Sequence, residues 1–356
     1  MSGIFLEPIG LIYGPTASEA ISLGAALPLA GSSWIAFSGV RLWEGEPGNL
    51  KHAIARTATI QAIEEPRVKE LLDRIVTARP PLAGVSLERP RIMGVVNVTP
   101  DSFSDGGETL ESAAAVERAT SLAAEGAAFI DVGAESTRPG ADGISPSEEL
   151  ARLMPVLSGL KDLAVPASVD TRKPAVMRAA VEAGAAMIND ISALAYDATS
   201  VETAVALSVP VVLMHAQGEP KTMQDNPAYK DVTIEVYEWL ERRIEAVEAA
   251  GLPRDRILAD PGIGFGKTAA HNLTLLRTLG LFHGLGVPLI VGTSRKNFLG
   301  RITGEKTPKG RVSESVTTAI AVAAQGVQVL RVHDVDATNR AFSVWLALHR
   351  GVETAI

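Results

Sequence analysis

Short apolar runs in residues 89–356 end in, or are followed by, side chains of types that could bind a ligand or act in catalysis. The residues concerned are Asn97, Asp131, Asp170, Asn189, Asp190, His215, Asp260, Ser294, Arg295, Lys296, Arg331 and His333. Any one of them could be a helix cap, since Asp and Asn are common at the start of the helix that follows a strand. Eight consecutive runs that all deliver such residues are harder to explain by caps alone. We therefore predict a ligand site where these side chains meet.

The types of these residues indicate what would bind. Asp170, Asn189 and Asp260 offer carboxylate and amide groups, which suit a flat heterocycle that carries several N–H donors. A second set is basic and suits a phosphate or carboxylate group. This set comprises Arg138, Arg295, Lys296, Arg331 and His333. Together the two sets predict a substrate with both a donor-rich ring and an anionic arm.

Three features resemble known nucleotide or metal sites only in part. Residues 261–268 read PGIGFGKT, but the Walker pattern needs a glycine at position 261, where this chain has proline. Gly264, Gly266 and Ala269 fit a loose dinucleotide spacing, yet they do not open a first βαβ unit. We interpret these glycines as positions where the backbone approaches a ring ligand closely. His215 has no second histidine at metal-ligand spacing, so a zinc site is not expected.

The apolar runs alternate with amphipathic stretches, and this alternation predicts how the side chains are positioned. The expected strands are 92–98, 128–132, 166–170, 187–191, 210–214, 257–260, 288–291 and 328–332. The expected helices are 112–125, 146–160, 174–183, 198–207, 232–250, 273–279, 313–325 and 337–350. Eight such units predict parallel strands in a (β/α)₈ TIM barrel, with the site at the carboxyl ends of the strands. A doubly wound open sheet is the alternative fold.

Residues 1–88 follow a different pattern and are predicted to form an extra N-terminal α/β segment. A strand is expected around Trp34, Phe37, Val40, Leu42 and Trp43, and a helix is expected over residues 50–78. A break before Pro90 divides the chain into residues 1–88 and a catalytic barrel of residues 89–356. We expect the N-terminal segment to be a structural appendage or an oligomer contact.

Composition excludes several classes of protein. The chain has 356 residues, of which 46% are hydrophobic and 21% charged, as in ordinary globular proteins. It has no cysteine, which excludes disulfides, thiolate metal sites and cysteine nucleophiles. The net charge of -8 argues against a nucleic-acid binder or a protein of anionic membranes. The start lacks a basic signal-peptide region, and the uncharged stretch 20–40 contains serines, glycines and a proline. A cytoplasmic protein is therefore expected.

Several segments, in order along the chain, resemble the dihydropteroate synthase family. Residues 92–107 read IMGVVNVTPDSFSDGG and resemble the signature of that family, and residues 131–140 read DVGAESTRPG and resemble its second segment. Further matches are SVDT at 168–171, INDI at 188–191, LMH at 213–215, PKTMQ at 220–224, DPG at 260–262, SRK at 294–296 and RVHDV at 331–335. The resemblance covers residues 90 to about 350. It implies a TIM barrel, in agreement with the pattern of strands and helices.

The resemblance implies an activity in folate biosynthesis. The family condenses 6-hydroxymethyl-7,8-dihydropterin pyrophosphate with p-aminobenzoate to give 7,8-dihydropteroate and pyrophosphate, with Mg²⁺ as cofactor. It also implies a homodimer. Loss of pyrophosphate leaves a cation delocalised into the dihydropterin ring, which Asp260 would favour, while Mg²⁺, Arg331 and His333 would stabilise the departing anion. The arylamine is already a fair nucleophile, so positioning is expected to matter more than a strong base.

The resemblance also assigns roles to particular residues. The catalytic residues it implies are Asp260, Lys296, Arg331, His333 and the loop residue Asp105. The substrate-binding residues it implies are Asp170, Asn189, Ile191, Met214 and Phe265 around the pterin, and Phe103, Thr137, Arg138, Pro139 and Ser294 around p-aminobenzoate. Thr137 also matches a pyrophosphate position, and Asn97 is the implied Mg²⁺ ligand. Two mobile loops are implied at residues 99–108 and 134–142.

Three departures from the family pattern lie outside the assigned chemistry: Ala134, Ala216 and Glu314-Ser315. Two rival functions stay open at this point. A pterin-binding methyltransferase would share the barrel and the acidic pocket, but would not be expected to carry the SRK and RVH segments. A catalytically silent relative that binds a pterin would be expected to have lost a loop, Lys296 or His333, and all of these are present.

Overall fold

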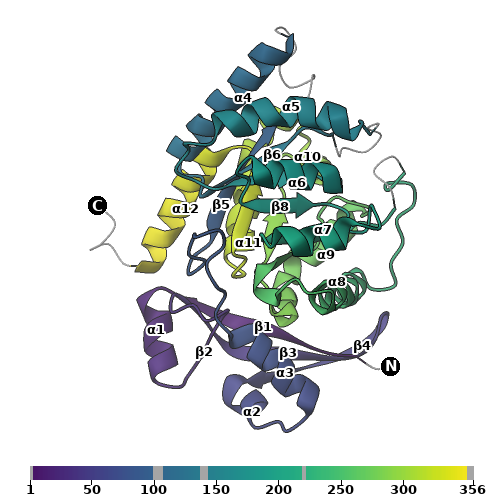
Figure 1. The fold of residues 1–356 in the computed structure, drawn as a ribbon. Helices are drawn as coiled ribbons and strands as arrows, with labels where there is room; N and C mark the ends of the chain where they lie inside the picture. The colour runs from purple at the N-terminus through teal and green to yellow at the C-terminus, as the bar shows by residue number, and fades with distance from the viewer. Residues whose placement is uncertain (1–2, 99–106, 137–142, 219–221, 351–356) are drawn as a thin grey trace.

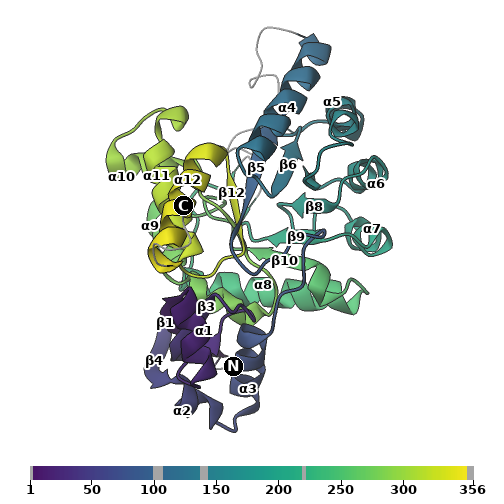
Figure 2. The same cartoon turned by 90° about the vertical axis from the view of Figure 1, so that its left-hand side faces the viewer.

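The computed structural model describes residues 3–98, 107–136, 143–218 and 222–350, and its larger part is a barrel of eight parallel strands (Figures 1 and 2). The strands are β5 (Arg91–Asn97), β6 (Phe129–Gly133), β7 (Ala167–Asp170), β8 (Met187–Asp190), β9 (Val211–Met214), β10 (Ile257–Asp260), β11 (Ile290–Gly292) and β12 (Val329–Val332). Seven neighbouring pairs form ladders in the order β10-β9-β8-β7-β6-β5-β12-β11. A single parallel bridge between Ala259 and Leu289 joins β10 to β11. This confirms the (β/α)₈ barrel over the open sheet.

Helices surround the barrel, as expected for parallel strands joined by crossovers. They are α4 (Gly107–Ala124), α5 (Pro146–Gly159), α6 (Pro174–Glu182), α7 (Ser200–Leu207), α8 (Val232–Ala249), α9 (Ala269–Arg277), α10 (Asn297–Thr303), α11 (Val312–Ala323) and α12 (Val335–Arg350), with short 3₁₀ turns η2 (Arg254–Arg256), η3 (Leu279–Leu285) and η4 (Pro308–Gly310). The predicted helix 273–279 begins four residues earlier, because Thr268 caps it by accepting the backbone N–H of His271. Helix α10 was not predicted. No helix in the described ranges has the length and apolar character needed to cross a membrane.

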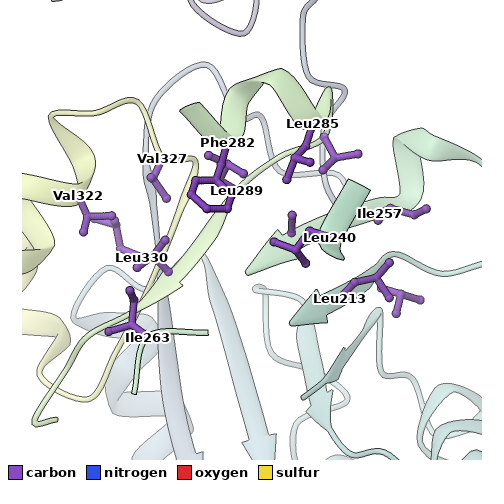
Figure 3. Close-up of a cluster of buried hydrophobic side chains, with 14 of the residues drawn as sticks. Leu213, Leu240, Ile257, Ile263, Phe282, Leu285, Leu289, Val322, Val327 and Leu330 are labelled. Carbon is purple, nitrogen blue, oxygen red and sulfur yellow. The ribbon is translucent and has the colours of Figure 1, made fainter. Parts of the chain in front are cut away.

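Successive residues of each strand face opposite sides of the barrel wall, and this alternation separates two apolar layers. Outward side chains pack under the helices, where Figure 3 shows Leu213 and Ile257 near Leu240 of α8, and Leu330 near Val322 of α11. Inward side chains form an apolar floor, closed by Leu82 and Leu87 from the segment before β5. The strand residues of the floor are Met93, Phe129, Met187, Val212, Leu258, Ile290 and Val329. Residues two positions further along each strand therefore also face inward, above this floor.

The N-terminal segment forms an antiparallel sheet with three helices. Its elements are β1 (Gly3–Tyr13), α1 (Pro15–Ser22), β2 (Leu27–Pro28), β3 (Ile35–Glu46), β4 (Asn49–Arg56), α2 (Thr57–Gln61) and α3 (Pro66–Val76). Strand β3 confirms the strand expected around Trp34–Trp43. The predicted helix 50–78 is wrong in its first third, where residues 49–56 pair with β3 as an edge strand. Pairing with β3 outweighs the weak helical spacing there, and the one long helix, α3, starts only at Pro66.

This segment packs against η3 of the barrel through β1 and α3, and Figure 1 shows it below the barrel. Phe5 contacts Tyr237 of α8 edge to face, with ring centroids 5.3 Å apart. Trp34 contacts Trp345 of α12 at 5.2 Å, and Arg67 and Arg74 both pair with Glu241 of α8, at 2.6 and 2.7 Å. The buried side chains of the segment and of the barrel form one continuous apolar core.

A shared core predicts that the two parts unfold together. Trp34 is 6% exposed, and Trp34→Ala is expected to lower the free energy of unfolding by about 3–5 kcal/mol. Urea unfolding followed by both far-UV circular dichroism and fluorescence should show one transition moved to lower urea. Leu23→Ala, at a side chain that is 74% exposed, is the matched control and should leave the midpoint almost unchanged. An unaltered midpoint in Trp34→Ala, or two separate transitions in the wild type, would contradict a shared core.

Candidate active site

A network of buried polar side chains stands above the barrel floor, at the carboxyl ends of the strands. Asp131 of β6 is 0% exposed, and its Oδ2 accepts hydrogen bonds from Asn189 Nδ2 at 3.0 Å and Arg331 Nε at 2.7 Å. Arg331 also donates through Nη2 to Asp170 Oδ2 at 2.8 Å. The structure thus brings Asp170, Asn189 and Arg331 together, as the sequence predicted. The carboxylate at the centre of the network is that of Asp131, for which the sequence indicated no particular role.

Burial and neighbouring charges shift the pKa values of this network in opposite directions. Burial raises the pKa of Asp170 to about 7, although the Arg331 guanidinium opposes the shift. For Arg331, burial acts to lower the pKa, but the carboxylates of Asp131 and Asp170 outweigh it and hold the pKa above its usual range. Arg331 therefore stays charged, and its guanidinium lies against the acidic side chains.

Asp260 and Lys296 form a second part of the site, beside an aromatic wall. Asp260 Oδ1 accepts the backbone N–H of Gly262 at 2.7 Å, and Lys296 Nζ lies 4.8 Å above the centre of the Phe265 ring. Lys296 Nζ also donates to the carbonyl oxygen of Ile263. Burial raises the pKa of Asp260, opposed by Lys296, and burial lowers the pKa of Lys296 to about 8, opposed by Asp260.

Apolar side chains predicted to line the ring pocket lie around these groups. Met214 is buried at the end of β9 and pairs in register with Asp260. Ile191 follows β8 directly and is half-buried.

The two polar residues at the end of β8 point in opposite directions. Asn189 faces into the barrel, whereas Asp190 turns away and accepts the backbone N–H groups of Ser192 and Leu194. Asp190 is therefore a turn cap and not part of the pocket.

The third part of the site joins the ends of β11 and β12. Ser294 Oγ lies 3.1 Å from His333 Nδ1 and accepts the backbone N–H of His333 at 3.2 Å. Arg295, which the sequence placed among the cations for an anionic arm, instead pairs with Asp334, with Nε 3.0 Å from Oδ2. Asn97 ends β5 in register with Gly133 of β6 and is half-buried. The predicted residues Phe103, Asp105, Thr137, Arg138 and Pro139 lie outside the described residues.

The structure also shows a buried ion cluster that the sequence did not indicate. Lys173 Nζ lies 3.0 Å from Glu135 and pairs with Glu149, and both Lys173 and Glu149 are buried. Arg172 Nε adds a bond of 3.2 Å to Glu135. Burial acts to raise the pKa of Glu135, but Lys173 and Arg172 hold it below its usual value. In sequence these charges resemble ordinary surface residues of helix ends, and only the packing of α5 against α6 buries them.

An inward acidic pocket beside basic groups, on the rim of a (β/α)₈ barrel, defines a class of enzyme that binds a polar ring with an anionic substituent. Residues 93–333 match the family described as pterin binding enzyme. The chain therefore belongs to the pterin-binding enzymes.

Proteins of similar sequence and structure show to which group of pterin-binding enzymes the chain belongs. A dihydropteroate synthase of Neisseria meningitidis is 46% identical over 269 residues, which cover 74% of this chain and 94% of the relative. A solved dihydropteroate synthase of Xanthomonas albilineans with 4-aminobenzoic acid is 50% identical, with a TM-score of 0.71, and the match covers 75% of this chain and 96% of that one. The same enzyme in complex with 7,8-dihydropteroate matches at 46% identity with a TM-score of 0.68, over 74% and 95%. Within the pterin-binding family the chain belongs to the dihydropteroate synthases, which are transferases.

The N-terminal segment stands apart from these matches. The family match starts at residue 93, and the relative from Neisseria meningitidis is almost fully covered by the aligned part. Residues 1–88 therefore have no counterpart of similar size in that relative.

Proposed function

We propose that the chain condenses 6-hydroxymethyl-7,8-dihydropterin pyrophosphate with p-aminobenzoate in folate biosynthesis. In this reaction the arylamine nitrogen bonds to the pterin methylene carbon, the carbon–oxygen bond to pyrophosphate breaks, and the nitrogen releases a proton. The observation that carries the proposal is the network of Asp131, Asp170, Asn189 and Arg331 beside Asp260 and Lys296. It offers acceptors for a donor-rich ring next to cations for an anionic leaving group.

Each part of the rim is suited to one task in this reaction. Asp260 would stabilise positive charge that develops on the dihydropterin as pyrophosphate leaves, and Phe265 and Met214 would cover the ring faces. Arg331 and His333 would bind the leaving pyrophosphate, which requires Arg331 to share its guanidinium between Asp170 and the anion. Ser294, bonded to His333, would contribute to the p-aminobenzoate side.

The donor chemistry of the rim fits a magnesium ion held mainly by substrate. Among the described residues no cluster of three or more His, Asp or Glu side chains could hold a metal alone. Mg²⁺ commonly uses one or two protein oxygens together with phosphate oxygens, and the Asn97 carboxamide at the end of β5 offers one such oxygen. When bound there, the ion would neutralise part of the pyrophosphate charge.

The two rival functions differ from the synthase in what they do with a pterin. A methyltransferase has no use for pyrophosphate-binding cations, and Arg331, His333 and Lys296 are all present at this rim. A silent relative would bind the pterin without turnover. The presence of the SRK and RVH segments and of the buried network favours the synthase.

Pyrophosphate release tests the proposal. The purified chain is incubated with the pterin pyrophosphate and Mg²⁺, with and without p-aminobenzoate, and both pyrophosphate and dihydropteroate are measured. We expect equal amounts of the two products when the arylamine is present. Pterin binding without either product would support the silent relative. Omission of Mg²⁺ is expected to abolish turnover, and undiminished turnover in a chelator would remove the ion from the proposal.

We also propose that the chain is a cytoplasmic homodimer. The absence of cysteine agrees with a reducing compartment, and the family resemblance implies a dimer. An apolar groove between α9 and α11, with the partly exposed Leu273, supports a contact between copies on this face. Light scattering coupled to size-exclusion chromatography should give twice the mass of one chain, and Leu273→Glu should shift the profile to the single-chain mass.

A further inference from the structure

The loop after β10 contains the glycine-rich stretch 261–267, and it packs directly on the backbone that follows β9. Gly262 and Gly266 have φ values of +67° and +60°, which L side chains rarely adopt. A Cβ atom at Gly262 would overlap the carbonyl oxygen of His215, and one at Gly266 would overlap that of Gln217. The glycines that resemble a phosphate loop therefore allow two backbone segments to touch.

Lys267 connects the same two segments by hydrogen bonds. Its Nζ lies 2.9 Å from His215 Nδ1, 3.0 Å from the carbonyl oxygen of Phe265 and 3.3 Å from that of His215. The lysine is 2% exposed. An ammonium group has three hydrogens, and here each has an acceptor within the protein, so this lysine does not reach out to a phosphate as its near-motif would suggest.

The surroundings of Lys267 favour a fixed arrangement. The His215 ring packs edge-on against Trp239, with centroids 5.0 Å apart. Burial, aided by the charge of Lys267, lowers the pKa of His215 to about 2, so the imidazole is neutral and its Nδ1 can accept. Burial also lowers the pKa of Lys267, while Asp260 raises it and Lys296 lowers it further. Tyr229 donates from its hydroxyl to the carbonyl oxygen of Gly266 at 2.9 Å, which adds a second tie to the loop.

The two segments that Lys267 connects each carry an apolar side chain that is expected to line the ring pocket. Met214 comes immediately before His215, and Phe265 lies two residues before Lys267 and accepts from it through its carbonyl group. We propose that Lys267 is a positioning residue for the pterin pocket, which holds the Phe265 wall at a fixed spacing from the end of β9. The inference rests on the proposed function, because it specifies how the same site binds its ring substrate.

This arrangement predicts an effect confined to one substrate. Without the ammonium group, His215 Nδ1 and two carbonyl oxygens would lose the donor that the described residues give them, and the loop would relax to find water. Phe265 and the backbone near Asp260 would move with it. Ser294 is the residue of the p-aminobenzoate side that lies in the described ranges, and the structure shows no contact there between Ser294 and Lys267.

The test compares Lys267→Met with Lys309→Met, an exposed lysine of η4. Binding of the pterin pyrophosphate is measured by calorimetry without p-aminobenzoate, and KM for each substrate is measured separately. We expect the Kd of the pterin to rise about tenfold in Lys267→Met, with KM for p-aminobenzoate within about twofold and no change in Lys309→Met. A double-mutant cycle with Phe265→Ala should be non-additive, because both changes act on the same wall.

Other outcomes would overturn the inference. An unchanged pterin Kd in folded Lys267→Met does so, as does an equal loss for both substrates, which a merely structural role would give. If Lys267→Met does not fold, Tyr229→Phe removes the second tie, and it should weaken pterin binding in the same direction by a smaller factor. Wild-type protein that binds pterin without turnover would refute the proposed reaction and leave this inference standing, whereas wild type that binds no pterin would refute both.

Discussion

Asp260→Asn is expected to lower kcat about 10²- to 10³-fold while the protein stays folded. Asp260 is buried at the end of β10 beside Lys296. Its negative charge would stabilise the positive charge that develops on the pterin ring. The amide keeps the shape and can still accept the Gly262 N–H, so only the negative charge is removed. The loss should therefore fall on turnover, in the step in which charge develops, more than on substrate affinity.

A buried carboxylate at the same rim provides the control for this experiment. Asp190 is also buried, but its oxygens accept Ser192 and Leu194 backbone N–H groups outside the pocket. Asp190→Asn should leave kcat within about threefold of wild type in the fraction that folds. Asp260→Asn with kcat within about tenfold of wild type would show that the charge is not needed.

The pH profile gives a second check on Asp260. Because burial raises its pKa, the ionised form is lost as the pH falls through a value above that of an exposed aspartate. The wild-type kcat should therefore decline on the acid side at a higher pH than an ordinary aspartate would produce. In Asp260→Asn this acid limb should be absent.

The barrel could be predicted from sequence because its strands carry a strong physical signal. Each is a short apolar run buried on both faces, and each is followed by polar residues that start the next helix. The edge strand β4 gave no such signal, since most of its side chains are exposed and its pairing depends on β3. Local spacing cannot register a paired residue elsewhere in the chain, such as Gly39 for Arg56.

The site could be predicted as a set of residue types, but not as a network. The polar residues at the strand ends were visible in sequence, and the structure brings Asp170, Asn189 and Arg331 together. Asp131 gained its central place only when β6 and β12, which both neighbour β5 in the barrel, brought their inward side chains together. Lys267 was visible only as part of an imperfect phosphate motif, because nothing in the sequence shows that its amine turns inward to His215. Contacts between residues that lie far apart in the sequence decide both cases.

Asp131→Asn is the second large prediction, and it concerns stability as well as binding. The carboxylate is fully buried and receives Arg331 Nε at 2.7 Å, so its loss leaves the half-buried guanidinium with Asp170 as its remaining anionic partner in the network. Breaking a buried ion pair by removing one partner costs about 3–5 kcal/mol. We expect the free energy of unfolding to fall by about that amount in urea, and pterin binding to weaken because Asn189 and Arg331 lose their common acceptor.

An exposed ion pair supplies the comparison for Asp131→Asn. Asp336 and Arg340 lie 3.7 Å apart on α12 with both side chains mostly exposed, and Asp336→Asn should cost less than about 1 kcal/mol. If Asp131→Asn and Asp336→Asn lower the free energy of unfolding equally, the buried network stabilises the protein no more than an exposed ion pair does. The decisive measurement is the free energy of unfolding of the double variant Asp131→Asn with Arg331→Met. In that variant both charges of the pair are removed, so neither is left without its partner. Its cost should be well below the sum of the two single costs, and simple additivity would show that the two side chains do not stabilise each other.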